Sequence, residues 1–212
     1  MQLFIVGGAP VDPKVIEDFE AMGIPMIQGY GMTENSPIIA VNRDRCSKAD
    51  AAGFVMPNTE VRILDPDKKG VGEVICRGPS VMIGYYNDPV MTEQVLKDGW
   101  LYTGDLGYFD SEGYLHINGR KKNVIVTKNG KNIFPEEVEY YLQESPYIAE
   151  ALVHGIKDEK SGDTIVKAEI YPDYEYINET VGDMTESGWQ QMFKETIDDI
   201  NDKMPQIGRA HV

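Results

Sequence analysis

The chain has 212 residues, a formal net charge of −15 at pH 7 and an isoelectric point near 4.6. This length can bury a substantial core, and so acidic a chain is a poor candidate for binding nucleic acid or anionic membrane surfaces. The cysteines, Cys46 and Cys76, lie far apart without a CxxC motif, which indicates free thiols and favours a cytoplasmic location. We expect neither a signal peptide nor a transmembrane segment, which leaves peripheral membrane contact open.

Residues 1–50 read as an α/β segment. "MQLFIVGG" predicts a buried strand that ends in a glycine turn, and "DPKVIEDFEAMG" predicts a helix. Asp12 can cap this helix, Pro13 suits its first position, and Gly23 ends it. "IPMIQGYG" is a second strand, and ligands of such sheets bind beyond the carboxyl ends of the strands.

Residues 51–118 change character, with short strands separated by turn sequences such as "DPDKKG" and "DSEG". They predict a small antiparallel barrel or sheet. From residue 120 the pattern changes again, to short strands, a helix starting at Pro135, and a last helix with one apolar face. That face is expected to belong to the core; its residues are Trp189, Met192, Phe193, Ile197, Ile200 and Met204. We therefore predict an α/β plus α+β protein, with a large domain to residue 119 and a smaller one over 120–212.

Charge is distributed unevenly at this boundary. "GRKKNVIVTKNGK", residues 119–131, carries only basic charges, whereas acidic side chains predominate afterwards. A basic stretch in an acidic chain favours a small anionic ligand. The alternative is a solvated hairpin edge guarded by lysines.

Three groups of residues could carry chemistry, while Walker, HExxH and GxSxG motifs are not found. In "GYGMTENSP", glycines allow close backbone approach, Tyr30 offers a flat face for a base, and Glu34 could ligate Mg²⁺. The alternative is a tight loop with a surface carboxylate.

The second group is Asp105, expected at a strand end after "YTG", and Arg120 after Gly119. The carboxylate could accept both hydroxyls of a ribose, and the arginine could bind the same sugar or a phosphate. The alternative is that Asp105 and Asp110 are ordinary turn residues. The third group is the charged joint at Arg120–Lys122, which suits a hinge or a plain linker.

In this order, "VGGAP", "QGYGMTE", "YTGD" and "GR" resemble the adenylate-forming superfamily of acyl- and aryl-CoA synthetases, luciferases and adenylation domains. The resemblance covers residues 3 to 205. "GYGMTENSPIIAVNR" and "GRKKNVIVTKNGKNIFPEEVE" look most like long-chain fatty-acid–CoA ligases.

The resemblance implies roles for the matching residues. Thr33 would hold phosphate oxygens, Glu34 would bind Mg²⁺, Asp105 would hold the ribose with Arg120 alongside, and Lys122 would be the hinge of a carboxyl-terminal lid. The residues implied around adenine are Gly8, Ala9, Pro10, Gly29, Tyr30 and Gly31. Gly130 and Lys131 would lie in a loop that helps to form the coenzyme A tunnel.

The implied reaction activates a fatty acid with ATP as an acyl-adenylate, then transfers the acyl group to coenzyme A with release of AMP. The family's upstream phosphate loop and its closing catalytic lysine are not found in this sequence. The resemblance therefore implies a carboxyl-terminal portion of a synthetase that is inactive by itself. Three alternatives stay open: a ligase that stops at the acyl-adenylate, an adenylation domain that loads a carrier protein, and a nucleotide-binding module without turnover.

Overall fold

The computed structural model describes residues 3–43, 46–127, 131–157, 163–182 and 185–203. The chain divides into two compact units, Met1–Lys121 and Lys122–Val212. The sequence analysis predicts a domain boundary after Gly119.

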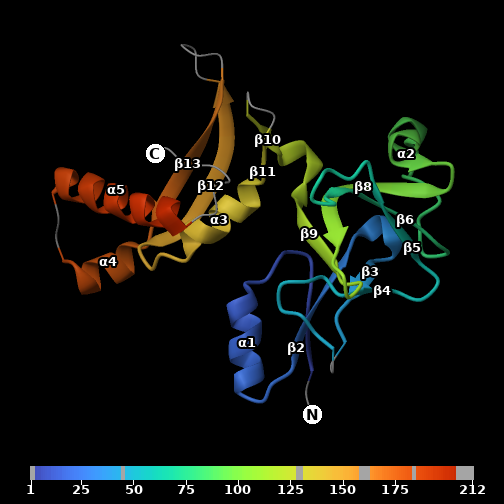
Figure 1. The fold of residues 1–212 in the computed structure, drawn as a ribbon, viewed down its shortest axis with the longest axis horizontal. Coiled ribbons are helices and arrows are strands. Elements are labelled where there is room, and N and C mark those ends of the chain that lie inside the picture. The colour runs from blue at the N-terminus through green and yellow to red at the C-terminus, as the bar shows by residue number, and fades with distance from the viewer. Residues whose placement is uncertain (1–2, 44–45, 128–130, 158–162, 183–184, 204–212) are drawn as a thin grey trace. The chain divides into compact units, whose positions relative to one another are not determined.

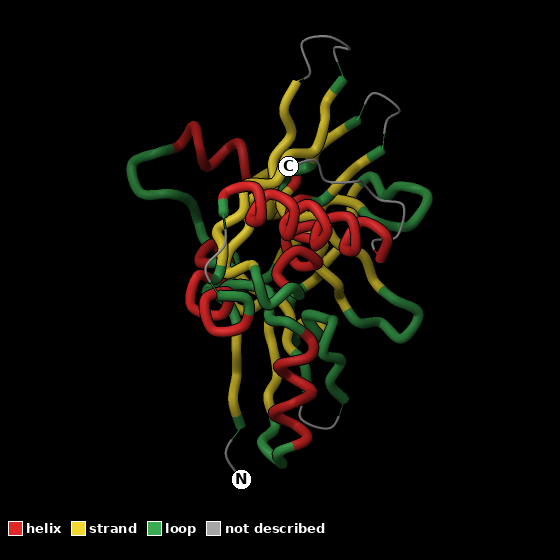
Figure 2. Tube along the Cα trace, turned by 90° about the vertical axis from the view of Figure 1, so that its left-hand side faces the viewer, coloured by secondary structure: helices red, strands yellow, loops and turns green. Residues whose placement is uncertain are grey.

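The first half of unit 1 is built on a four-stranded sheet in the order β1-β2-β3-β4. Its elements are β1 (Phe4–Val6), α1 (Pro13–Ala21), β2 (Met26–Gly31), β3 (Ile38–Val41) and β4 (Phe54–Val55). Strands β1 and β2 are parallel and the other pairs antiparallel. Helix α1 runs beside β1 and β2 (Figures 1 and 2). It begins as predicted: the Asp12 carboxylate accepts a hydrogen bond from the Lys14 amide, and Pro13 is the first helical residue.

The prediction that the first strand is buried is wrong. Ile5 is 65% exposed, and Phe4 is also exposed. In the described chain β1 is an edge strand that pairs only with β2, so its apolar run has no second neighbour. Local hydrophobicity could not distinguish an edge from the centre of a sheet.

The second half of unit 1 is the predicted small antiparallel sheet, in the order β5-β6-β8-β7 with β9 also paired to β8. Its elements are β5 (Glu60–Leu64), β6 (Gly72–Arg77), α2 (Pro89–Val95), β7 (Leu96–Lys97), β8 (Trp100–Phe109) and β9 (Leu115–Arg120). Helix α2 was not predicted, although Asp88 caps it and Pro89 starts it in the same way as in α1.

Two small buried clusters join this sheet to β3. One contains Ile39, Cys76 and Leu101, and the other contains Ala40, Val74 and Leu115. The ring of Tyr30 packs against both clusters, which fixes the end of β2 between the two sheets.

Unit 2 is an α+β unit built on the β12–β13 hairpin, whose strands are antiparallel. Its elements are β10 (Ile125–Val126), β11 (Asn132–Ile133), α3 (Pro135–Gln143), β12 (Ile148–Lys157), β13 (Thr164–Pro172), α4 (Tyr174–Thr180) and α5 (Glu186–Lys203). Helices α3 and α5 lie against the hairpin (Figure 1). Ile197 and Ile200 of α5 are buried in this core and Phe193 packs against it, as predicted, whereas Met204 lies outside the described residues.

Candidate nucleotide-binding site

The site is centred on the carboxylate of Asp105, which two distant segments contact. The Tyr30 hydroxyl donates a hydrogen bond to Asp105 Oδ2 at 2.6 Å. Arg120 Nε lies 3.1 Å from Asp105 Oδ1, and Arg120 Nη1 donates to the Thr103 carbonyl at 3.0 Å. The structure therefore joins Tyr30, from the first predicted group, to Asp105 and Arg120, which together form the second.

Asp105 does not lie at a strand end, and that prediction is wrong. It lies inside β8, paired in register with Arg120 of β9. Gly104 before it has a φ of +72°, so the glycine bends the strand without ending it. Because β8 and β9 are neighbours, strand pairing alone sets the arginine opposite the carboxylate.

The side chain of Asp105 is largely buried, so water competes little for its hydrogen bonds. Its side chain is 12% exposed, against 48% for Arg120. Burial, followed by the charge of Asp105, raises the pKa of Tyr30 far above its usual range, so the phenol stays protonated and donates to the carboxylate. The site thus presents a charged acceptor beside an aromatic ring.

The glycines around Tyr30 have a reason within the chain. A Cβ on Gly31 would lie 2.0 Å from the Pro37 carbonyl oxygen, and one on Gly29 would lie 3.2 Å from the Ala40 carbonyl oxygen. The Met32 amide donates to that same Pro37 carbonyl at 2.7 Å. The returning strand β3 therefore requires this lack of bulk, and access for a nucleotide stays a prediction.

Thr33 and Glu34 lie on a short 3₁₀ helix, Thr33–Asn35, directly after β2. Thr33 is exposed, and Glu34 is half-buried. The Glu34 Oε1 atom accepts a hydrogen bond from the Tyr85 hydroxyl at 2.7 Å. Sequence reasoning missed Tyr85, since a contact 51 residues away leaves no local pattern.

These oxygens fit a magnesium ion only in company with other ligands. Among the described residues, no group of three or more His, Cys, Asp or Glu side chains could hold a metal. Mg²⁺ commonly uses one or two carboxylates together with water and substrate phosphates, so a single glutamate beside a threonine hydroxyl matches that habit. Glu34 as a ligand of the ion stays a prediction.

The other predicted residues lie in several places. Gly8, Ala9 and Pro10 are exposed in the loop after β1, where Gly8 has a φ of +93° and open space around it. Lys122 is exposed and opens unit 2, while Lys131 also lies in unit 2, where its backbone pairs with Thr127. Gly130 lies outside the described residues.

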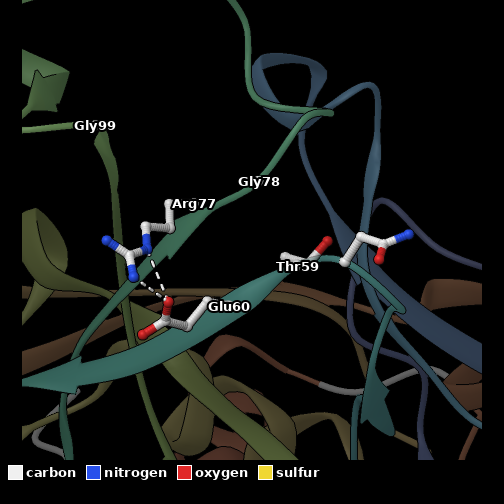
Figure 3. Close-up of a pocket in the computed structure, with 6 residues that line it drawn as sticks. Thr59, Glu60, Arg77, Gly78 and Gly99 are labelled. Carbon is white, nitrogen blue, oxygen red and sulfur yellow. Dashed lines mark hydrogen bonds and ion pairs between the residues drawn. The ribbon is translucent and has the colours of Figure 1, made fainter.

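A separate hollow lies over strands β5 and β6 (Figure 3). Its lining residues are Asn58, Thr59, Glu60, Arg77, Gly78 and Gly99. Glu60 accepts hydrogen bonds from Arg77 and Arg62, which lower its pKa. Since these ion pairs already occupy the charges, the hollow offers no open anion site, and none of the predicted nucleotide residues lines it.

Comparison with known proteins relates the chain to nucleotide-using ligases. Residues 1–86 match the family described as "AMP-binding enzyme". The chain is 42% identical over 173 residues to an indoleacetate–CoA ligase of Aromatoleum aromaticum, covering 78% of this chain and 34% of the relative. It is 39% identical over 167 residues to a long-chain-fatty-acid–CoA ligase of Bacillus subtilis, covering 75% of this chain and 30% of the relative.

Solved structures give the same result. The o-succinylbenzoate coenzyme A synthetase of Bacillus subtilis in complex with AMP superposes with a TM-score of 0.80 and 29% identity, over 99% of this chain and 41% of that one. The same enzyme with ATP and magnesium gives a TM-score of 0.73 and 31% identity, over 87% and 40% of the two chains. These matches confirm the predicted fold class. The chain spans about a third of the length of the curated relatives it matches.

Proposed function

We propose that the chain, whose residues 1–86 match the AMP-binding enzyme family and whose relatives include acyl-CoA ligases, serves the ATP-dependent activation of a carboxylic acid and its transfer to coenzyme A. The observation that carries the proposal is the buried Asp105 carboxylate, held between Tyr30 and Arg120.

Asp105 is the residue we assign to the ribose. Its two oxygens bind a phenol and a guanidinium, both of them donors, as ribose hydroxyls are. A bound ribose would either displace Tyr30 and Arg120 from these oxygens or bind the oxygens together with them. The Tyr30 ring, held between the two clusters, would then lie beside the base, with Gly8, Ala9 and Pro10 as the further adenine contacts.

The proposed chemistry proceeds in two steps. A carboxylate oxygen of the acid attacks the α-phosphorus of ATP, the bond to the oxygen bridging to the β-phosphorus breaks, and pyrophosphate leaves. The sulfur of coenzyme A then attacks the acyl carbon, loses its proton to solvent, and AMP leaves with the former carboxylate oxygen. Thr33 and Glu34 serve the first step by holding phosphate oxygens and the metal, and a bound Mg²⁺ would supply neutralisation of phosphate charge.

We further propose that Lys122 is the pivot between the two steps. It is exposed and begins unit 2, while Lys121 just before it binds the buried Glu73 carboxylate of unit 1 at 2.7 Å. This ion pair anchors the chain up to Lys121, and Lys122 follows as the middle residue of a short 3₁₀ helix, Lys121–Asn123, at the boundary between the units. Lys131 and Gly130 would follow the pivot into the coenzyme A tunnel.

For the acid, we propose a long-chain fatty acid. The support is the resemblance of residues 29–43 and 119–139 to long-chain fatty-acid–CoA ligases, together with relatives of that name. Relatives named for indoleacetate and 2-succinylbenzoate make aromatic acids the competing substrates.

The location we propose is the cytoplasm, because Cys46 and Cys76 are both free thiols. None of the helices in the described part of the chain has the length and hydropathy to cross a membrane.

The test uses the protein from the complete reading frame that contains these residues. It is supplied with ATP, Mg²⁺, coenzyme A and, in turn, palmitate, indoleacetate and 2-succinylbenzoate, and acyl-CoA and AMP are measured by mass spectrometry. We expect palmitoyl-CoA and AMP in equal amounts, and a rate lower by at least about 10-fold in Glu34→Gln but not in Glu17→Gln on exposed α1. Acyl-AMP that accumulates without thioester would instead indicate a ligase that stops at the adenylate or one that loads a carrier protein. Nucleotide binding without any product would indicate a binding module.

A further inference from the structure

The turn that carries Glu34 is hydrogen-bonded to a segment far away in the sequence. After β6, the chain of residues 78–88 passes over the 3₁₀ helix. The Met82 amide donates to the Glu34 carbonyl at 2.8 Å, and the Ser80 hydroxyl donates to Asn35 Oδ1 at 3.2 Å. The Tyr85 hydroxyl donates a third hydrogen bond, to Glu34 Oε1. Asn35 is fully buried, so the packing around its side chain also holds the turn in place.

Tyr85 is itself fixed by the start of α2. Its amide donates to Thr92 Oγ1 at 2.9 Å, and that hydroxyl donates to the Asp88 carbonyl at 2.8 Å. Gly84 before it has a φ of +152°, and a Cβ there would lie 3.0 Å from the Thr92 side chain. The backbone at Tyr85 is therefore set by a capped helix, so the phenol is not a loosely placed surface group.

The neighbours of Tyr85 show that its inward position is specific. Ile83 and Tyr86 are 101% and 94% exposed, whereas Tyr85 is half-buried. Two adjacent tyrosines thus have opposite surroundings, and only Tyr85 contacts the predicted metal ligand.

The donor and the acceptor of this hydrogen bond are fixed by the two groups. A phenol can donate one hydrogen bond, and an ionised carboxylate only accepts. The Tyr85 hydroxyl is therefore the donor of this hydrogen bond, and Glu34 Oε1 is its acceptor. Within the described part of the chain, Glu34 forms no ion pair, and its second oxygen, Oε2, has no hydrogen bond. One oxygen is thus oriented by the protein and the other is left for a cation.

We propose that Tyr85 is a positioning residue for the divalent cation: by binding Glu34 Oε1 it fixes the carboxylate so that Oε2 ligates the ion that accompanies ATP. The proposal rests on the proposed function and deepens it. Groups that bind a metal's ligands from behind fix ligand orientation, and their loss costs metal affinity even though they never touch the ion.

The experiment compares Tyr85→Phe with Tyr86→Phe, a matched control that removes the same hydroxyl one residue away from a fully exposed ring. The protein from the complete reading frame is titrated with ATP in a calorimeter at stepped free Mg²⁺, and separately with AMP in EDTA. In Tyr85→Phe the Mg²⁺ concentration needed for half-maximal ATP affinity should rise by about 10- to 100-fold. AMP binding in EDTA should be unchanged, and Tyr86→Phe should match the wild type in both titrations.

Three other outcomes have different meanings. An unchanged Mg²⁺ requirement in Tyr85→Phe would overturn the positioning role and leave the proposed function intact. Equal losses of AMP and ATP binding in that variant would also overturn it, because they would show that Tyr85 only supports the fold. A wild type that binds neither nucleotide would overturn the proposed function, and the role of Tyr85 with it.

Discussion

Replacing Asp105 by alanine tests the assignment of the ribose site. The side chain is 12% exposed, so its hydrogen bonds form with little competition from water. A hydrogen bond to a charged acceptor contributes about 1.5–3 kcal/mol. If the substitution removes one such bond to the ribose and no other group replaces it, AMP affinity should fall by roughly 10- to 150-fold.

The measurement is calorimetric titration with AMP in EDTA, which removes any contribution from a metal. Asp105→Ala also leaves Tyr30 and Arg120 without a common acceptor, so some loss of stability is expected. The control is Asp110→Asn in the turn after β8. That carboxylate binds Lys48, His116 and two backbone amides, so the variant is destabilised without touching the assigned site.

A folded Asp105→Ala protein that binds AMP as tightly as the wild type would refute the reasoning. So would an equal loss of affinity in Asp110→Asn, because stability alone would then account for both results.

Two further substitutions, and the pH dependence of Asp110→Asn, test other parts of the account. Lys122→Pro fixes φ near −65° at the proposed pivot; acyl-adenylate formation should survive while thioester formation falls, and equal loss of both half-reactions would make Lys122 merely structural. Asp110→Asn also has a pH signature. The hydrogen bond from Lys48, supported by the Tyr114 amide and His116, holds the pKa of Asp110 well below its usual range. Because the folded pKa is the lower one, this stabilisation is present above about pH 4 and is lost as the pH falls further. The melting temperature of Asp110→Asn should therefore lie below that of the wild type at pH 7, and the gap should narrow below about pH 4; a constant gap would contradict the assignment. Gly31→Ala places a Cβ 2.0 Å from the Pro37 carbonyl oxygen, so thermal unfolding should show a loss of about 1–3 kcal/mol or more, and a neutral substitution would mean that β3 does not return as described.

Local features of the fold could be predicted because their causes are local. Asp12 and Pro13 start α1 through a side-chain cap and a fixed φ, both of which act within one turn of helix. The short strands of residues 51–118 follow from their turn sequences. Asp88 and Pro89 repeat the signal at the start of α2, so that helix was also accessible to the same reasoning.

Features that depend on neighbours in space could not be predicted in this way. The exposure of Ile5 depends on which strands flank β1, and the position of Asp105 inside β8 depends on the register with β9. Gly104 looks like a turn residue in the sequence, but pairing on both sides of it carries the strand through.

The candidate site divides in the same way. Tyr30, Asp105 and Arg120 were selected from short motifs, and the structure joins them. Tyr85 lies in a stretch with no motif of its own, and its importance appears only when the segment after β6 reaches the Glu34 turn. The reason for a glycine at position 31 also differs from the prediction, because the nearest obstacle to a side chain there is the chain's own backbone.

The central claim is that this chain serves to join a carboxylic acid to AMP. The most direct measurement is the exchange of radiolabelled pyrophosphate into ATP by the protein from the complete reading frame, with Mg²⁺ and palmitate and without coenzyme A. Formation of an acyl-adenylate is reversible, so the account predicts exchange that requires both the acid and Mg²⁺ and falls in Asp105→Ala. A folded protein that binds ATP but shows no acid-dependent exchange with palmitate, indoleacetate or 2-succinylbenzoate would contradict it.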